Sequence, residues 1–257
     1  MKYIFMLLMV VIELFGGVVK SPIVSVNVDE TLVSIKIAKI DVGMSGFVVH
    51  NIAQNHSTIL KSAVVKSYDE QSQIATLELS EYDALRQNSL PNGKWHVEVG
   101  DMVVLAFGYT RGLLIAPSED IYYRVTRATK HLQWIHPDIF ATLLSFNGHP
   151  TPLREDFKKL ALSTSVGLLF FYIEKKLYTV DSQSFKILNI SDAPLVQKDV
   201  KPPFYTRVEE IEASWWGEGS DELESYAPHY YKLLLEANPN HKKLQAEIDS
   251  FNKKGQS

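Results

Sequence analysis

Side chains that could bind a metal or move a proton are present in this sequence, but their spacing does not gather them. Of the eight histidines, none is followed by another four residues later, the spacing that lets a helix hold a metal. His131 and His136 flank a short apolar segment and His149 lies in a Gly-His-Pro turn, so surface or turn roles are favoured over a metal pair. Nucleophile-elbow, Walker and dinucleotide-binding motifs are also absent. The sequence therefore predicts no catalytic, cofactor-binding or metal-binding residues and a protein that is not an enzyme.

A second group of candidate residues combines acids with tryptophan. The acidic stretch from Glu209 to Glu224 lacks the alternating Asp/Asn-Gly spacing of a calcium loop, so a solvated face is favoured over a calcium site. Trp215 and Trp216 stand inside it. Adjacent tryptophans can anchor a protein partner, or they can seal the C-terminal segment onto the body of the protein. Both interpretations of the pair stay open.

Lysines and acids alternate on the last predicted helix. Lys243 stands four residues before Glu247, and Asp249 four residues before Lys253, followed by Lys254. Such spacing predicts exposed i,i+4 ion pairs, each worth about 0.3 kcal/mol to the helix. From the spacing alone, these residues indicate a solvated helix face.

Composition restricts the possible partners and functions. The 257 residues carry a formal net charge of −4 and no cysteine. A chain without a basic stripe does not suit nucleic acid, which needs lysines and arginines to neutralise phosphates. The absence of cysteine excludes disulfides, thiolate chemistry and a lipoprotein anchor.

The N-terminus has the layout of a signal peptide. Lys2 precedes a short apolar run over residues 4–12, which Glu13 and then Gly16–Gly17 end. We predict a signal peptide over residues 1–21, cleaved between Gly17 and Ser21. An uncleaved anchor over residues 3–19 is the alternative, although a membrane span needs about 20 apolar residues. No later segment is long enough to span, so the protein is expected to be exported with no transmembrane span after signal removal.

The first half of the chain alternates with the period of β-strands. Strands are expected over residues 23–28, 32–40, 47–50, 63–67 and 74–79, and a short helical turn over 81–90. Residues 99–120 read as two apolar strands joined in a hairpin by a turn between Gly108 and Gly112. About seven short strands predict a small antiparallel β-sandwich or barrel.

The second half changes to helical spacing. Helices are expected after Ser118, from Pro137 to Gly148 and after Pro152, and an apolar strand follows over 166–173 with two hairpin strands. Further helices are expected over 221–237 and near the C-terminus. The predicted fold class is α+β: a β-rich module at 22–117, an α+β module with a short meander at 118–191, and a linker with C-terminal helices at 192–257.

Several segments resemble one known family. They are Gly46–Val49, Glu98–Val104, Leu113–Glu119 and Pro203–Glu209, together with the helix-link-helix from Pro137 to Phe157. In this order and spacing they resemble the N-terminal domain of exported plasminogen-binding proteins of certain spiral Gram-negative bacteria. The resemblance covers roughly residues 23–235, and its most specific parts are Ala-Pro-Ser-Glu and Pro-Phe-Tyr-Thr-Arg-Val.

The resemblance implies a secreted factor at the cell surface or outer membrane that binds host plasminogen and needs no cofactor. In that family, capture is attributed to lysines, above all a C-terminal lysine, which this chain lacks because it ends at Ser257. Binding here would use the Lys243–Glu247 or Asp249–Lys253 pair, or a terminus trimmed back to Lys254. The alternative is a structural or assembly component of the periplasm or outer membrane with an envelope protein as partner.

Overall fold

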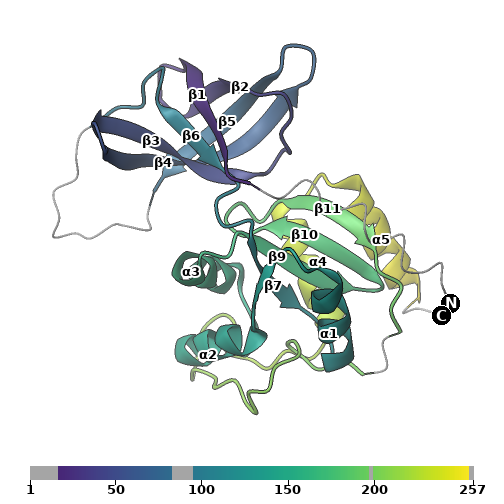
Figure 1. Cartoon of the computed structure of the whole chain (residues 1–257). Helices are drawn as coiled ribbons and strands as arrows, with labels where there is room; N and C mark the ends of the chain where they lie inside the picture. The colour runs from purple at the N-terminus through teal and green to yellow at the C-terminus, as the bar shows by residue number, and fades with distance from the viewer. Residues whose placement is uncertain (1–16, 83–94, 197–198, 255–257) are drawn as a thin grey trace. The chain divides into compact units, whose positions relative to one another are not determined.

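The structure is a computed structural model that describes residues 17–82, 95–196 and 199–254. The described chain forms two compact units, which meet in the sequence between Tyr109 and Thr110. The α+β class is confirmed, with an all-β unit first and a mixed unit second (Figure 1). The predicted helical turn at 81–90 falls almost wholly outside the described residues, as does most of the predicted signal peptide.

The first unit is a closed antiparallel barrel of six strands. They are β1 (Val19–Val26), β2 (Leu32–Lys36), β3 (Ser45–Ala53), β4 (His56–Asp69), β5 (Ile74–Glu81) and β6 (Met102–Leu105). The order is β1-β2-β5-β4-β3-β6, and pairing of β1 with β6 closes the circle. Alternate residues point inward, so Val33, Ile35 and Leu77 are fully buried.

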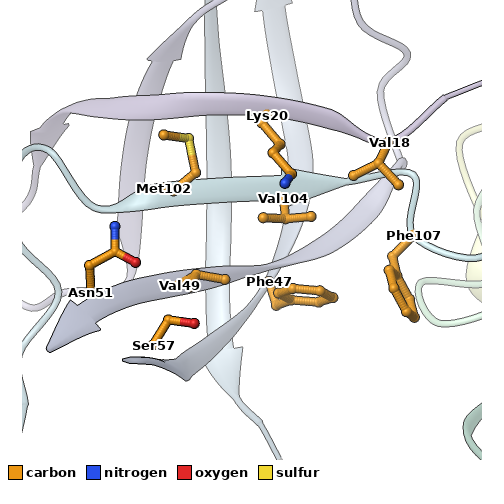
Figure 2. A pocket seen from close by; sticks show the side chains of 9 residues that line it. All are labelled: Val18, Lys20, Phe47, Val49, Asn51, Ser57, Met102, Val104 and Phe107. Carbon is orange, nitrogen blue, oxygen red and sulfur yellow. The ribbon is translucent and has the colours of Figure 1, made fainter. Parts of the chain in front are cut away.

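A glycine permits the close approach of β3 and β6. A Cβ atom on Gly46 would lie 2.0 Å from the carbonyl oxygen of Val104, which no side chain can tolerate. The outer face beside this contact carries a groove of about 570 Å³ (Figure 2). Its walls are mostly apolar, with Phe47, Met102 and Val104 among the lining residues.

The second unit is built on a mixed sheet in the order β11-β10-β9-β7-β8. Its strands are β7 (Arg111–Ile115), β8 (Gln133–Ile135), β9 (Leu168–Ile173), β10 (Lys176–Asp181) and β11 (Ile187–Asp192). Strand β7 is parallel to both β8 and β9, and β9, β10 and β11 form the predicted antiparallel meander. The predicted hairpin over residues 99–120 is therefore wrong. Strand β6 pairs with β1 and β3 in the barrel, whereas β7 pairs only with strands of the second sheet.

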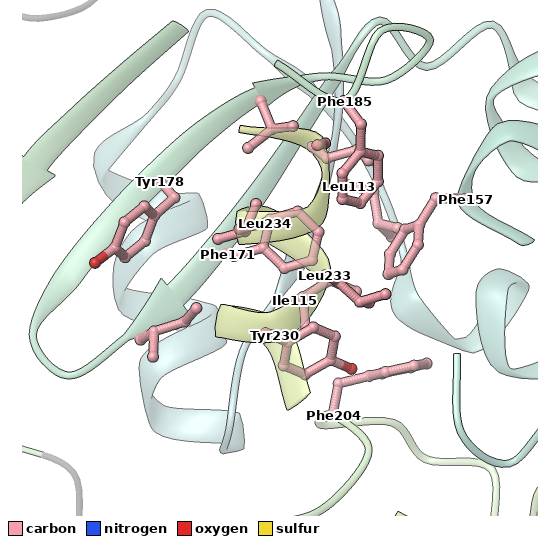
Figure 3. Close-up of a cluster of buried hydrophobic side chains, with 14 of the residues drawn as sticks. Leu113, Ile115, Phe157, Phe171, Tyr178, Phe185, Phe204, Tyr230, Leu233 and Leu234 are labelled. Atoms are coloured by element: carbon pink, nitrogen blue, oxygen red, sulfur yellow. The ribbon is translucent and has the colours of Figure 1, made fainter. Parts of the chain in front are cut away.

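In the part of the chain that the structure describes, five helices accompany this sheet. They are α1 (Glu119–Ala128), α2 (Pro137–Asn147), α3 (Arg154–Thr164), α4 (Tyr226–Ala237) and α5 (Lys242–Lys254). Residues of α2, α3, α4 and α5 share one apolar core with the sheet, in which Phe157, Phe171 and Tyr230 lie close together (Figure 3). Residues 192–257, predicted as a separate segment, thus contribute to the same core as residues 118–191. Ile121 and Val125 of α1 are buried outside this cluster.

The turn between α4 and α5 covers the edge strand β11. The side chain of Asn238 accepts a hydrogen bond from the backbone N of Ile187 (3.0 Å) and donates to the carbonyl of Phe185 (3.0 Å). Lys243 donates from Nζ to the carbonyl of Ile190 (3.0 Å). An uncovered edge would offer unpaired backbone groups to another chain, so these contacts protect the sheet from edge-to-edge association.

Candidate functional site

The carboxyl ends of β7 and β8 are where a mixed sheet of this topology would bind a ligand. The chain leaves β7 into α1, returns through β8 on one side, and reaches β9 on the other side of β7. Ligands of open α/β sheets bind in the crevice at such a reversal of strand order. Helix α1 begins after Ser118 and helix α2 after His136, so the first turns of two helices follow the carboxyl ends of these strands.

In this protein a later segment of the chain lies against the end of β7. We call residues 201–208 the strap. Its backbone pairs with the extension of β7, since the N–H groups of Lys201 and Tyr205 donate to the carbonyls of Pro117 and Ala116, both at 2.7 Å. The Phe204 ring is fully buried and stacks on Phe140 with centroids 5.4 Å apart.

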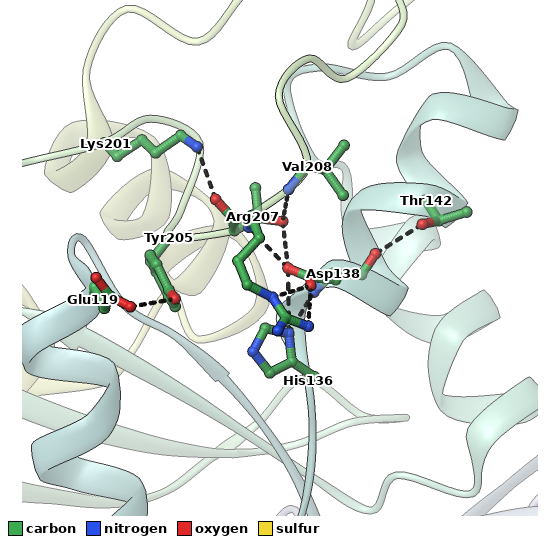
Figure 4. A network of polar contacts seen from close by, with 9 residues as sticks. Glu119, His136, Asp138, Thr142, Lys201, Tyr205, Arg207 and Val208 are labelled. Carbon is green, nitrogen blue, oxygen red and sulfur yellow. Dashed lines mark hydrogen bonds and ion pairs between the residues drawn. The ribbon is translucent and has the colours of Figure 1, made fainter.

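One carboxylate holds the strap to the start of α2. Asp138 accepts hydrogen bonds from the Thr206 hydroxyl (2.8 Å), the Arg207 backbone N (2.9 Å) and Arg207 Nε (2.7 Å), and Arg207 Nη2 lies 2.6 Å away (Figure 4). Burial opposes ionisation of this carboxyl, but these donors outweigh it and lower the pKa of Asp138 to about 2. Its charge is thus paired mainly with the strap, and its low pKa makes it a weak base.

Tyrosine and histidine side chains make further contacts beside Asp138. Tyr205 donates its hydroxyl to Glu119 (3.0 Å), and its ring lies against Tyr122, with centroids 5.5 Å apart. Burial and the Glu119 carboxylate both raise the pKa of Tyr205. His136 accepts the backbone N–H of Asp138 at Nδ1 (3.2 Å), so it caps α2. Residue types alone did not indicate this network, although Pro137–Asp138 at a helix start was a usable signal.

Other histidines also pair with carboxylates. Nδ1 lies 2.7 Å from the acid in His50–Asp101, 2.7 Å in His96–Glu30 and 3.0 Å in His149–Asp156. Within the described ranges, no group of three histidine, aspartate or glutamate residues could hold a metal ion. Among the helices that the structure describes, none has both the length and the apolar character needed to cross a bilayer.

The lysines of α5 do not pair as predicted. Lys243 contacts the Ile190 carbonyl, and Glu247 pairs instead with Lys176 of β10 (3.2 Å), which also contacts Asp192 (2.7 Å). The predicted Lys243–Glu247 pair is therefore wrong, because the sheet edge offers each side chain a partner from outside the helix. Asp249 and Lys253 are exposed, and no ion pair joins them in the described structure. Lys254 is the last residue of α5.

The comparison with known proteins identifies the family. The chain matches the family described as "Plasminogen-binding protein pgbA N-terminal" over residues 18–234. It belongs to this family. It is 29% identical over 199 residues to the plasminogen-binding protein PgbA of Helicobacter pylori strain J99. The aligned residues make up 76% of this chain and 42% of that protein. No solved structure matches it.

A second relative matches with similar identity and coverage. The plasminogen-binding protein PgbA of Helicobacter pylori strain 26695 is 28% identical over 201 residues, again 76% of this chain and 42% of that protein. The chain thus spans about two fifths of the length of the curated relatives it matches. The part shared with the PgbA N-terminal family contains the barrel, the strap and the tryptophan pair, whereas α5 lies beyond residue 234.

The tryptophan pair lies inside the PgbA N-terminal region and faces solvent. Trp215 is 100% exposed and Trp216 is 86% exposed. The interpretation of the pair as a plug is therefore wrong, because neither indole packs on the body. Phe146, near the end of α2, is also exposed (88%), although it was not among the residues predicted to bind a partner. Its place on the polar side of an amphipathic helix was the available signal.

Proposed function

We propose that this protein is an exported, non-enzymatic factor that binds plasminogen at the bacterial cell surface. The observation that carries the proposal is the family match over residues 18–234, since both matched relatives are named for plasminogen binding. The apolar run of residues 4–12 supports export. The strap lies against the chain just after β7 and is held by Asp138, so the place where sheets of this topology bind small ligands is occupied by the protein itself, which supports protein binding over catalysis.

The lysines of α5 are the proposed contact. Lys253 and Asp249 are exposed one helical turn apart without an ion pair between them, so an ammonium and a carboxylate are both available to a partner. Lys242 is exposed at the other end of the helix. Lys243 is less suited, because reaching a partner would break its hydrogen bond to Ile190. A pocket that binds lysine would gain its affinity from aromatic contact with the ammonium and from charge-assisted hydrogen bonds.

The test is binding of the purified protein to immobilised plasminogen with and without 6-aminohexanoic acid, a lysine analogue. We expect saturable binding that the analogue abolishes, and about tenfold weaker binding in the double variant Lys253→Ala, Lys254→Ala, because hot-spot residues dominate such contacts. The matched control is Lys39→Ala with Lys66→Ala, which removes two barrel lysines and the same charge. Binding that ignores the analogue, or no binding at all, would reject the proposal.

A further inference from the structure

The exposed tryptophans stand on a loop that the rest of the protein holds in place. The Ser214 backbone N donates to the Gly148 carbonyl (3.0 Å), and the Glu212 backbone N donates to the Ser145 hydroxyl (3.2 Å). On the other side of the pair, the Thr151 backbone N donates to the Gly219 carbonyl (3.1 Å). We call residues 212–221 the tryptophan loop.

The contact between Gly148 and the tryptophan loop requires a glycine. Gly148 adopts a left-handed conformation (φ +71°), and a Cβ atom there would lie 2.5 Å from the Cβ of Ser214. The Thr151 hydroxyl also donates to the carbonyl of Asp221 (2.7 Å). Both ends of the loop are thus tied to the turn between α2 and α3. A surface held in one conformation before binding loses less entropy when a partner docks.

The loop is aromatic, and the chain within it and on both sides of it is strongly acidic. Between residues 208 and 231 there are seven acidic residues and no lysine or arginine. The acids are Glu209, Glu210, Glu212, Glu218, Asp221, Glu222 and Glu224, and every one of them is exposed. Phe146 adds a third exposed ring one residue beyond Ser145, to which the loop is anchored. Charge complementarity therefore calls for a cationic partner.

We propose that the tryptophan loop is a docking surface for a cationic polypeptide segment. Arginine and lysine side chains of that segment stack on the indole faces of Trp215 and Trp216, and the surrounding carboxylates pair with the same cations. Arginine suits both contacts, because its planar guanidinium stacks on aromatic rings and pairs with carboxylates. Anionic membranes are disfavoured as the occupant, since seven carboxylates would face their negative surface potential. The surface is opposite in charge to the α5 lysines, so it goes beyond plasminogen capture.

The test uses a fluorescently labelled decaarginine peptide and the purified protein, with affinity measured by anisotropy at low and moderate salt. We expect Trp215→Ala with Trp216→Ala to weaken binding by about tenfold or more, as hot-spot aromatics do. Glu212→Gln with Glu218→Gln should weaken binding and flatten its salt dependence. Trp95→Ala, which removes a tryptophan that is 46% exposed in the barrel, is the matched control and should leave the affinity unchanged.

Three results would overturn the proposal. Unchanged affinity in the double tryptophan variant would mean that charge alone attracts the peptide, because that variant keeps all seven carboxylates. Binding to phosphatidylcholine vesicles without binding to the peptide would make the loop a membrane contact. Self-association of the protein that the double variant abolishes would make a second copy the occupant. Plasminogen binding, measured on the same variants, should stay at the wild-type level. The proposal of plasminogen binding is thus tested separately from the proposal of a docking surface on the tryptophan loop.

Discussion

Two aromatic pairs lie close together in the sequence and differ completely in exposure. Phe204 and Tyr205 of the strap are 0% and 8% exposed, whereas Trp215 and Trp216 are 100% and 86% exposed. Both pairs stand in polar stretches of the sequence with a serine or threonine beside them. Hydrophobicity alone therefore does not decide which pair is buried.

The difference lies in what the backbone around each pair contacts. The strap continues the sheet by donating to the carbonyls of Ala116 and Pro117, and Asp138 then fixes its far end. These contacts place Phe204 over the core. The tryptophan loop is tied instead to the end of α2 and the turn after it, through Ser145, Gly148 and Thr151. One pair is buried against the second unit, and the other stays available to a partner.

The largest expected effect is that of removing the buried ring. Phe204→Ala should lower the free energy of unfolding by about 3–5 kcal/mol, because it leaves a cavity beside Phe140 in the core. Phe146→Ala is the matched control, since this ring is 88% exposed and its loss should change stability by less than about 0.5 kcal/mol. Urea unfolding followed by circular dichroism measures both. Equal losses in the two variants would contradict the proposed division between buried and exposed aromatics.

A smaller effect is expected at the carboxylate that holds the strap. Asp138→Asn should cost about 1–2 kcal/mol near neutral pH, less than a full conversion of its pKa shift, because Arg207 is 66% exposed to solvent. The pKa of Asp138 is about 2 in the folded protein against 3.8 as its ordinary value. Its contribution is therefore complete above about pH 4 and is lost as the pH falls toward 2.

The same experiment has a pH control and a residue control. The stability difference between wild type and Asp138→Asn should shrink as the pH is lowered through this window, measured by urea unfolding at pH 7, 5 and 3. Asp120→Asn removes an exposed carboxylate that pairs with Arg124 within α1, and it should cost under about 0.5 kcal/mol. A difference that stays constant down to pH 3 would show that the ionised carboxylate does not stabilise the strap.

Local pattern predicted most elements of the fold but not how they pair. The alternation in Leu32–Lys36 and the Pro137 and Gly148 signals gave a strand and a helix that the structure confirms. The β6–β7 hairpin failed, because two apolar runs around a glycine turn have the same pattern whether they pair with each other or with distant strands. Their true partners, such as β1 and β9, are specified by packing far along the chain.

The candidate site was less predictable than the fold. The i,i+4 rule paired Lys243 with Glu247, but the edge of the sheet supplies the Ile190 carbonyl and Lys176 as alternative partners. Exposure of Trp215 and Trp216 could not be decided from residue type, since both a plug and an anchor need large aromatic rings. The strap network depends on Asp138 meeting Thr206 and Arg207 across a long sequence separation, which no local pattern reports.

The smallest expected effect is the most informative about the exposed pair. Trp215→Ala and Trp216→Ala should each change the free energy of unfolding by less than about 0.5 kcal/mol, because neither indole is buried in the free protein. The stability of these variants is compared with that of Trp134→Phe. Nε1 of Trp134 donates to the carbonyl of Thr129 (3.2 Å), and the Trp134 ring contacts Phe170 with centroids 5.0 Å apart. Acrylamide should quench the emission of Trp215 and Trp216 more strongly than that of Trp134. A stability loss above about 2 kcal/mol in the Trp215→Ala variant would mean that the indole packs on the body in solution. A neutral result leaves these rings with no structural role, and a role in contacting a partner then accounts for their exposure.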